Sequence, residues 1–208
     1  MKLALFGASG PTGEELVAQA LAADHELTAF ARRPAEVAPR GRLRVVQGDT
    51  TRDAAAVAEA VRGQDAVLST LGVGSTLFPT DLMQRSVANI LPAMEAAGVK
   101  RIVLMSAFGV GASRHDAPLL PRLMYCTFLR AIFDDKEKAE ERLRSSGLDW
   151  TIVYPVLLTN GPRTGRYRAG ERLDLHGLPT ISRADVAHFM LAEIASPRYV
   201  RKTVVLSH

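Results

Sequence analysis

Short runs of apolar residues recur along the chain, and most are followed by a stretch whose apolar residues have helical spacing. The apolar runs predict strands at 2–6, 26–30, 43–47, 65–71, 100–106, 149–154 and 201–206. The helical spacing predicts helices at 14–21, 53–61, 81–97, 134–143 and 182–194. Asp81 is the expected N-cap of the third helix, and Ser182 to Asp185 form a capping box at the start of the last. Strands that alternate with helices in this way form mostly parallel sheets covered on both faces. The pattern therefore predicts one α/β domain with a mostly parallel, doubly wound sheet flanked by helices.

Length and composition fit this architecture and exclude several other classes of protein. The 208 residues have the size of one domain, and 47% hydrophobic with 23% charged residues is ordinary for a globular protein. No apolar run has transmembrane length and no signal peptide precedes the first strand, so a cytoplasmic protein without a membrane partner is expected. Cys126 is the only cysteine and no Cys/His cluster has metal-ligand spacing, so no metal is expected. The net charge of +4 comes mostly from scattered arginines, so no nucleic-acid partner is expected.

A glycine-rich turn between the first strand and the first helix carries the strongest functional signal. Its sequence is Gly7-Ala-Ser-Gly-Pro-Thr-Gly13. In a dinucleotide-binding βαβ unit, the first glycine permits a tight turn and the second lets the backbone approach a pyrophosphate. The third glycine lets the helix pack close to the strand, so that the positive end of the helix faces the anion. Ser9 and Thr12 add hydroxyl donors, and the turn as a whole predicts a nucleotide cofactor.

The end of the second strand indicates which nicotinamide cofactor is used. NAD-selective sites usually have an acidic residue at this place, which accepts hydrogen bonds from both ribose hydroxyls. This chain has Arg32 and Arg33 there instead. A guanidinium pairs with a 2′-phosphate through two hydrogen bonds and also stacks on adenine, so NADP(H) is favoured. A solvated basic turn is the alternative interpretation.

Further candidates follow the later strands, whose carboxyl ends meet at one edge of the sheet. Asp49 either accepts a hydrogen bond from the adenine amino group or caps the helix that begins near Arg52, and the sequence leaves both roles open. Gly72 opens a glycine turn beside the expected cofactor crevice. Ser106 ends the fifth strand, with its hydroxyl expected to face the crevice, and Pro155 closes the sixth strand.

Two segments are expected to be loops that cover the substrate. Residues 109–121 carry glycines and prolines and few apolar repeats. Residues 159–180 are also rich in glycine and contain four arginines. These arginines would attract an anionic substrate or belong to a solvated surface.

With these residues in place, the chain resembles the atypical short-chain dehydrogenase/reductases of the NAD(P)-binding, NmrA-like group, and within it the biliverdin-IXβ/flavin reductases. The resemblance covers nearly the whole chain, and it implies a Rossmann-like sheet with NADPH bound across the glycine turn. The motifs that carry it are Gly7 to Gly13, Gly48-Asp49, Gly63-Gln-Asp-Ala-Val67, Ser106-Ala-Phe108, Ser146-Gly-Leu148, Thr164-Gly165, Ile181-Ser182, Asp185 and His188-Phe-Met-Leu191. The residues then expected at the cofactor are Gly7, Ser9, Gly10, Pro11, Thr12, Gly13, Arg32, Arg33, Asp49, Thr50, Leu71, Gly72, Ser106 and Pro155.

One departure from the usual short-chain dehydrogenase pattern affects the expected chemistry. Those enzymes use a Tyr-x-x-x-Lys pair, in which the lysine lowers the tyrosine pKa and the tyrosine acts as general acid. Lys136 stands where the resemblance places the lysine, but the residue four positions earlier is Ile132. Ser106 and Lys136 are therefore the catalytic candidates, with Ser106 positioning the acceptor or nicotinamide. Lys136 is either a ribose ligand or a plain surface lysine.

The leading hypothesis is an NADPH-dependent oxidoreductase, a monomer or homodimer, that transfers hydride to a flavin, bilin or quinone-like acceptor. Such small conjugated molecules spread the incoming electrons over their rings, so binding both partners in contact is enough. The alternative is a non-catalytic NADP(H)-binding redox sensor that acts through a protein partner. A sugar-nucleotide epimerase or dehydratase is a third hypothesis, suggested by the fold alone.

Overall fold

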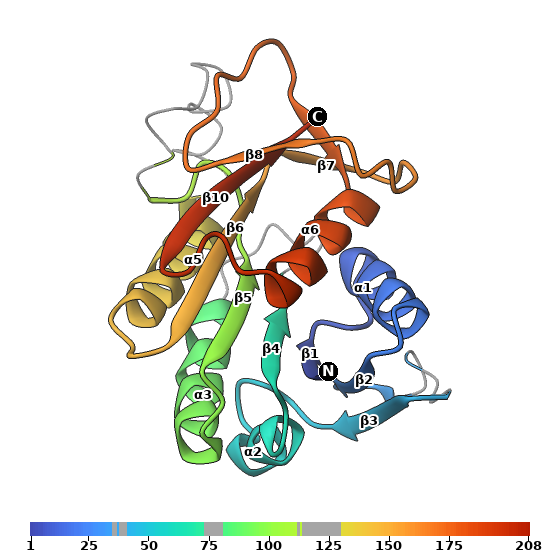
Figure 1. Ribbon diagram of the computed structural model, residues 1–208. Coiled ribbons are helices and arrows are strands. Elements are labelled where there is room, and N and C mark those ends of the chain that lie inside the picture. Colours follow the sequence, from blue (N-terminus) through green and yellow to red (C-terminus); the bar gives the residue numbers. More distant parts are fainter. Residues whose placement is uncertain (35–36, 38–40, 73–80, 112, 114–129) are drawn as a thin grey trace.

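The computed structural model describes residues 1–34, 37, 41–72, 81–111, 113 and 130–208. Over these residues an eight-stranded sheet lies at the centre, with the strand order β3-β2-β1-β4-β5-β6-β10-β8 (Figure 1). Its strands are β1 (Lys2–Phe6), β2 (Glu26–Ala31), β3 (Leu43–Gln47), β4 (Ala66–Ser69), β5 (Arg101–Met105), β6 (Asp149–Pro155), β8 (Arg168–Gly170) and β10 (Lys202–Ser207). Neighbouring strands are parallel except for β8, which is antiparallel to β10. The predicted mostly parallel sheet is confirmed.

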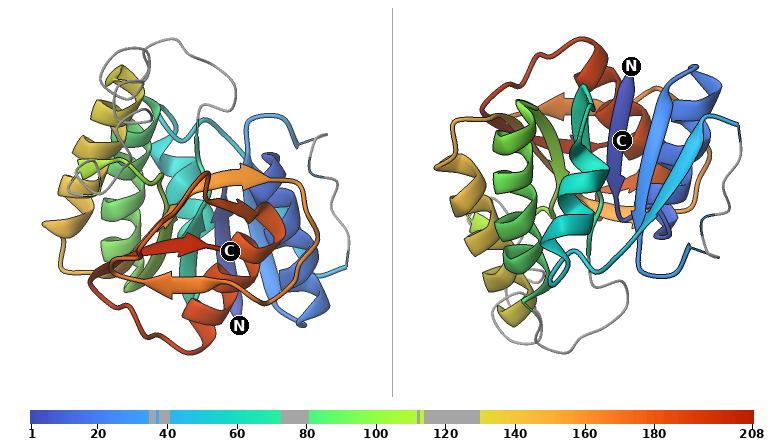
Figure 2. Two further views of the ribbon diagram at one scale, coloured as in Figure 1. Left: turned by 90° about the horizontal axis from the view of Figure 1, so that it is seen from above. Right: turned by 90° about the horizontal axis from the view of Figure 1, so that it is seen from below.

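Helices cover both faces of this sheet, as Figure 2 shows. Those that the structure describes are α1 (Pro11–Ala22), α2 (Ala54–Val61), α3 (Leu82–Ala97), α5 (Arg130–Arg144) and α6 (Arg183–Ala195). Helix α1 packs against α6 on one face, and α3 packs between α2 and α5 on the other. Strands covered on both sides need apolar residues on both sides, which explains the nearly continuous apolar runs in the sequence.

The turns after the central strands begin at one level of the sheet. Phe6, the last residue of β1, pairs with Phe30 of β2 on one side and with Ser69 of β4 on the other. The chain runs outward from β1 to β3 and then returns past β1 to form β4. In doubly wound sheets, ligands bind at such a reversal, beyond the carboxyl ends of the strands.

The cap of α3 differs from the one that the sequence suggests. Asp81 was the expected N-cap, and it stands at that position, but its side chain makes no capping hydrogen bond. It forms an ion pair with Arg85 at 2.6 Å instead. The backbone N–H groups of Met83 and Gln84 donate to the buried carboxylate of Asp135 on α5, at 2.9 and 3.0 Å. A residue on a neighbouring helix thus satisfies the free donors of this helix end.

The predicted loop at 159–180 contains and adjoins short strands that the sequence pattern did not indicate. Strand β7 (Leu157–Thr159) pairs in parallel with β9 (Thr180–Ser182), and β8 lies between them in the chain. Each has three residues, too few to show an alternating pattern. Most of the other predicted loop, 109–121, lies outside the described residues, as do Tyr125 and Cys126.

Asp185 in the first turn of α6 holds this segment to the body of the protein. The predicted capping box is present in part, since the Ser182 hydroxyl accepts a hydrogen bond from the Asp185 N–H at 3.0 Å. The buried Asp185 carboxylate accepts from the N–H groups of Thr164 and Gly165 at 2.9 and 2.8 Å, and the ring of His208 lies 2.9 Å away. Burial alone would raise the Asp185 pKa, but these hydrogen bonds outweigh burial and hold the pKa well below its usual range.

Asp185→Asn is expected to lower the free energy of unfolding by about 2–3 kcal/mol at pH 7, because several buried donors lose a charged acceptor. The folded-state pKa is depressed, so the stabilisation is present above the ordinary carboxyl pKa of about 4 and is lost as the pH falls toward the lower folded value. Urea unfolding between pH 7 and pH 2 measures how far the free energy of unfolding of the wild type falls with pH, and the variant should show a smaller fall. Asp174→Asn, at an exposed position in the same segment, is the control and should change neither quantity.

Candidate functional site

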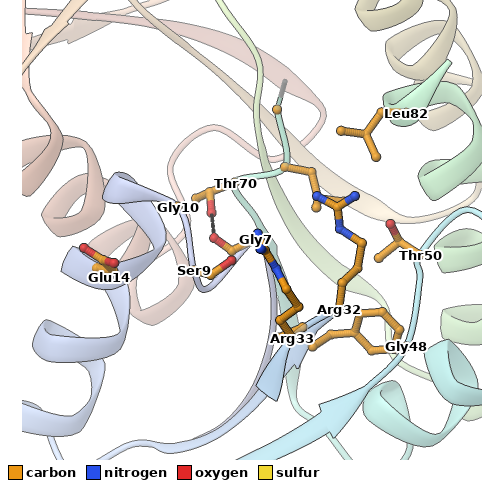
Figure 3. Close-up of a pocket in the computed structure, with 14 residues that line it drawn as sticks. Gly7, Ser9, Gly10, Glu14, Arg32, Arg33, Gly48, Thr50, Thr70 and Leu82 are labelled. Carbon is orange, nitrogen blue, oxygen red and sulfur yellow. Dashed lines mark hydrogen bonds between the residues drawn. The ribbon is translucent and has the colours of Figure 1, made fainter. Parts of the chain in front are cut away.

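A cleft of about 560 Å³ opens at the carboxyl ends of β1, β2, β3 and β4. It therefore occupies the reversal of strand order described above. Its lining, drawn in Figure 3, consists of Gly7, Ser9, Gly10, Glu14, Phe30, Ala31, Arg32, Arg33, Gly48, Thr50, Thr70, Leu71, Gly72 and Leu82. Eight of the fourteen predicted cofactor residues are in this set, so the strand ends converge as the sequence suggested.

The glycine turn has the geometry that its spacing predicts. Gly7 has a φ of +92°, a conformation that residues with a side chain rarely adopt. A Cβ at Gly13 would lie 2.0 Å from the Gly7 carbonyl oxygen, so only glycine lets α1 approach the end of β1 this closely. A Cβ at Gly10 would meet only that same oxygen, at 3.5 Å, among the described residues. The described residues thus leave room at Gly10, which lines the cleft.

The first turn of α1 is arranged to receive an anion. Gly10 is its N-cap and provides no side-chain hydrogen bond, and Pro11 takes the first helical position without an N–H group. The uncapped N-terminal end of a helix attracts negative charge through its N–H groups and its dipole. This end borders the cleft through Ser9 and Gly10, so the site fits a pyrophosphate.

Two arginines at the end of β2 supply positive charge to the cleft. Figure 3 shows the Arg33 side chain pointing toward Ser9 and Gly7, and the Arg32 side chain beside Thr50 and pointing toward Leu82 at the start of α3. Among the described residues of the lining Glu14 is the remaining charged one, so their charge balance is positive. A cleft with this balance suits an anionic ligand, including a 2′-phosphate.

Asp49 forms a local turn and does not cap the following helix, and its contact with adenine stays a prediction. Its Oδ1 accepts hydrogen bonds from the N–H and hydroxyl of Thr51, at 2.8 and 2.7 Å, and these bonds lower the Asp49 pKa. Helix α2 begins only at Ala54, so the prediction that Asp49 caps it is wrong. Asp49 instead closes a local turn, which holds the neighbouring Thr50 at the cleft.

Six predicted cofactor residues are not part of the lining. Thr12 and Gly13 are buried within α1, after Pro11. Asp49 has the local contacts just described, and Ser106 and Pro155 lie one and two strands farther along the sheet edge, at the ends of β5 and β6. Their proposed contacts with a cofactor remain predictions.

Ser106 belongs to a buried hydrogen-bonded cluster whose centre is Glu140 on α5. The Ser106 hydroxyl donates to Glu140 Oε1 at 2.5 Å, and the Tyr154 hydroxyl donates to Glu140 Oε2 at 2.5 Å. Arg144, one turn farther along α5, donates to Glu140 Oε2 at 2.8 Å and to the Tyr154 oxygen at 3.1 Å. Burial raises the pKa of Glu140 despite these donors, and burial followed by the Glu140 charge raises that of Tyr154.

Lys136 lies one turn before Glu140 on the same helix. It is 9% exposed, so the prediction of a plain surface lysine is wrong. Burial lowers the pKa of Lys136, while the charges of Glu140 and Asp135 oppose that shift. The ribose contact remains a prediction.

Several functional candidates escaped sequence reasoning. Thr70 lines the cleft and donates its hydroxyl to the Gly7 carbonyl at 3.1 Å, yet in the sequence it is only one residue of the predicted strand at 65–71. Leu82 comes from a helix start, and Glu140 is one of several charged residues on an amphipathic helix. The only local signal for Glu140 was the i, i+4 spacing from Glu140 to Arg144.

Within the described residues no three His, Cys, Asp or Glu side chains gather as ligands for a metal. None of the helices described is long and apolar enough to cross a membrane.

The fold and the cleft define an NAD(P)H-binding protein. The NAD(P)H-binding family matches residues 7–197, and the chain belongs to this family. A curated relative, uncharacterized sugar epimerase YhfK from Bacillus subtilis strain 168, is 30% identical over 200 residues, which cover 93% of this chain and 88% of the relative.

Solved structures extend the likeness to reductases. ChuY, an anaerobilin reductase from Escherichia coli O157:H7, is 26% identical with a TM-score of 0.83, over 99% of this chain and 96% of ChuY. A short-chain dehydrogenase/reductase from Veillonella parvula DSM 2008, solved in complex with NADP, shares the fold with a TM-score of 0.83 at 18% identity, over 100% of this chain and 94% of that one. The resemblance to the atypical short-chain dehydrogenase/reductases is confirmed, and the fold is that of an NAD(P)H-binding oxidoreductase.

Proposed function

We propose that the protein is an NADPH-dependent reductase that delivers hydride to a flavin, bilin or quinone-like acceptor. The observation that carries the proposal is the cleft, which combines an uncapped helix N-terminus, a glycine at position 10 without close neighbours among the described residues, and two arginines at the end of β2. Bound NADPH would supply the hydride from its nicotinamide ring. The remaining chemistry belongs to the residues of the chain.

Each part of the cleft has one task in this proposal. The first turn of α1 and the Gly10 backbone hold the pyrophosphate, and Ser9 adds a hydroxyl donor. Arg32 and Arg33 hold the 2′-phosphate and adenine, which makes NADPH the preferred cofactor over NADH. The ends of β4, β5 and β6 lie in order along the same sheet edge, so Leu71, Ser106 and Pro155 form the path toward the nicotinamide.

A conjugated acceptor suits a site without the usual proton-donating tyrosine. Ile132 stands where that tyrosine would be, and it is buried on α5. A flavin, bilin or quinone accepts hydride into an extended ring system, so its reduction depends chiefly on contact with the nicotinamide. The name of ChuY as an anaerobilin reductase supports a tetrapyrrole-like acceptor for this chain too. The segments 109–121 and 159–180 are proposed to cover the acceptor.

The same cofactor site also serves a second candidate function, a non-catalytic redox sensor that reports the NADP(H) state to a protein partner. Ile132 in the place of the tyrosine is the observation that favours it. A sugar epimerase, the activity in the name of YhfK, is less well supported, because that chemistry calls for the tyrosine as proton donor and acceptor.

Consumption of NADPH by the purified protein, followed against FMN, riboflavin, biliverdin and a set of quinones, separates these functions. The reductase predicts saturable turnover with at least one acceptor, faster with NADPH than with NADH. Tight NADPH binding without turnover of any acceptor would favour the sensor instead.

A further inference from the structure

We infer that Glu140 is the proton store of the reductase and passes a proton through the Ser106 hydroxyl to the acceptor. This inference rests on the proposed function and deepens it. Glu140 is fully buried, and its two carboxyl oxygens contact two side chains at the ends of adjacent parallel strands, Ser106 of β5 and Tyr154 of β6. Burying a carboxyl group costs free energy of folding unless hydrogen bonds compensate for the lost water. Buried carboxyl groups with perturbed pKa values are therefore found often at functional sites.

The register of the sheet places the outer end of this relay beside the cleft. Ser69 of β4 pairs with Leu104 of β5. Leu71 and Ser106 each come two residues after one member of this pair, just beyond the ends of β4 and β5. Leu71 lines the cleft. Ser106 still donates its N–H to the Val153 carbonyl of β6 at 2.8 Å, which fixes its backbone. Its hydroxyl contacts the buried Glu140 carboxyl, and the inference places the acceptor on the other side of Ser106, at the sheet edge.

The proton balance of the reduction leaves a place for such a store. Hydride addition brings two electrons and one proton to the acceptor, which then carries an added negative charge and needs one more proton. For the transfer, the Ser106 hydroxyl turns its proton from Glu140 Oε1 toward the acceptor, and that O–H bond breaks. The Ser106 oxygen then takes a proton from the protonated Glu140 carboxyl across the same 2.5 Å contact. The resulting Glu140 carboxylate keeps its hydrogen bonds from Tyr154 and Arg144 and is protonated again from water.

The charged groups around Glu140 suit both of its protonation states. Lys136 and Arg144 lie on either side along α5, and Tyr154 faces Glu140 from β6. Arg144 is 34% exposed, so it connects the buried cluster to solvent. Glu137 Oε1 and the Tyr154 hydroxyl both lie near Gly111, since a Cβ at Gly111 would be 3.8 Å from the first and 3.7 Å from the second. Burial raises the Glu140 pKa, which favours the protonated carboxyl before the reaction, and the donors stabilise the carboxylate after it.

Glu140→Gln removes the acidic proton and keeps the shape of the side chain. We expect kcat with the best acceptor to fall about 100-fold, the size of a typical general-acid contribution, with the Kd for NADPH unchanged. In the wild type, kcat/KM should decline as the pH rises through the Glu140 pKa, and in the variant this decline should be absent. Wild-type turnover and pH profile in Glu140→Gln would overturn the inference.

Glu193→Gln is the matched control, because Glu193 is also buried and paired with an arginine. It contacts Arg101 at 2.9 Å, at the amino end of β5, the end opposite Ser106. This variant should lose stability and keep the pH profile. If it altered the pH profile as Glu140→Gln does, the effect would be structural and the inference would fail.

Tyr154→Phe provides a test if Glu140→Gln does not fold. It removes one donor to the carboxylate, so the Glu140 pKa should rise further and the decline in kcat/KM should move to higher pH. An unmoved profile contradicts the relay.

A readout that needs no turnover separates failure of the relay from failure of the proposed function. The ¹³C NMR signal of the Glu140 carboxyl, identified by its loss in Glu140→Gln, reports its protonation directly. A protonated carboxyl at neutral pH supports the proton store, and an ionised one overturns it even in an active reductase. A protonated carboxyl in a protein that reduces no acceptor would instead disprove the proposed function.

Discussion

Replacing Gly10 with alanine is expected to weaken NADPH binding at least tenfold, or about 1.4 kcal/mol, while leaving the protein at least as stable as the wild type. The φ and ψ of Gly10 are −83° and 158°, which any residue adopts, and the added methyl group would have an ordinary contact with Gly7. The methyl group would occupy the space through which the pyrophosphate approaches. Stability would even rise by up to about 1 kcal/mol, because alanine restricts the unfolded chain.

Gly13→Ala is the matched comparison, since it adds the same methyl group three residues later. There the Cβ would lie 2.0 Å from a backbone oxygen that cannot move away. We expect this variant to lose about 3 kcal/mol of stability through overpacking. Calorimetric titration with NADPH and thermal unfolding of both variants make the comparison. Equal losses of stability in the two variants, or unchanged NADPH affinity in Gly10→Ala, would contradict the assigned roles.

The double variant Arg32→Ala, Arg33→Ala is expected to bind NADPH about 100-fold more weakly, a loss of about 2.7 kcal/mol from the hydrogen bonds to a 2′-phosphate. NADH lacks this phosphate, so its affinity should change little beyond the lost stacking on adenine. The ratio of the two affinities therefore isolates the 2′-phosphate from the rest of the cofactor. Fluorescence or calorimetric titration of both cofactors measures it.

Arg62→Ala with Arg142→Ala is the control for general charge, because both of these arginines are exposed and neither lines the cleft. It removes the same two positive charges and should leave the affinity ratio unchanged. If the Arg32, Arg33 variant kept the wild-type ratio, the two residues would belong to a solvated basic turn, the alternative that the sequence allowed.

The parts of the fold that could be predicted depend on residues close together in the sequence. The glycine turn joins a strand to a helix within a few residues, and Gly10 and Gly13 both lie close to the Gly7 carbonyl, so the spacing of the glycines alone predicts the close approach of Gly13 to Gly7. The arginines directly follow an apolar strand, which places them at the strand end. Parallel strand order then brings both features to the same sheet edge.

The features that could not be predicted depend on residues that meet only in the folded protein. Asp135 caps a helix that starts about fifty residues earlier, and no local pattern distinguishes it from the capping candidate Asp81. Glu140 and Tyr154 look like an ordinary exposed helix charge and an ordinary strand aromatic. Only the packing of α5 against the ends of β5 and β6 shows that both are buried together with Ser106.

Calorimetric titration of the wild-type protein with NADPH and, in parallel, with NADH tests the central claim most directly. The account predicts one NADPH site per chain and binding at least tenfold tighter than that of NADH, about 1.4 kcal/mol or more. No heat of binding with NADPH, or equal affinity for the two cofactors, would contradict the assignment of the cleft as an NADPH site.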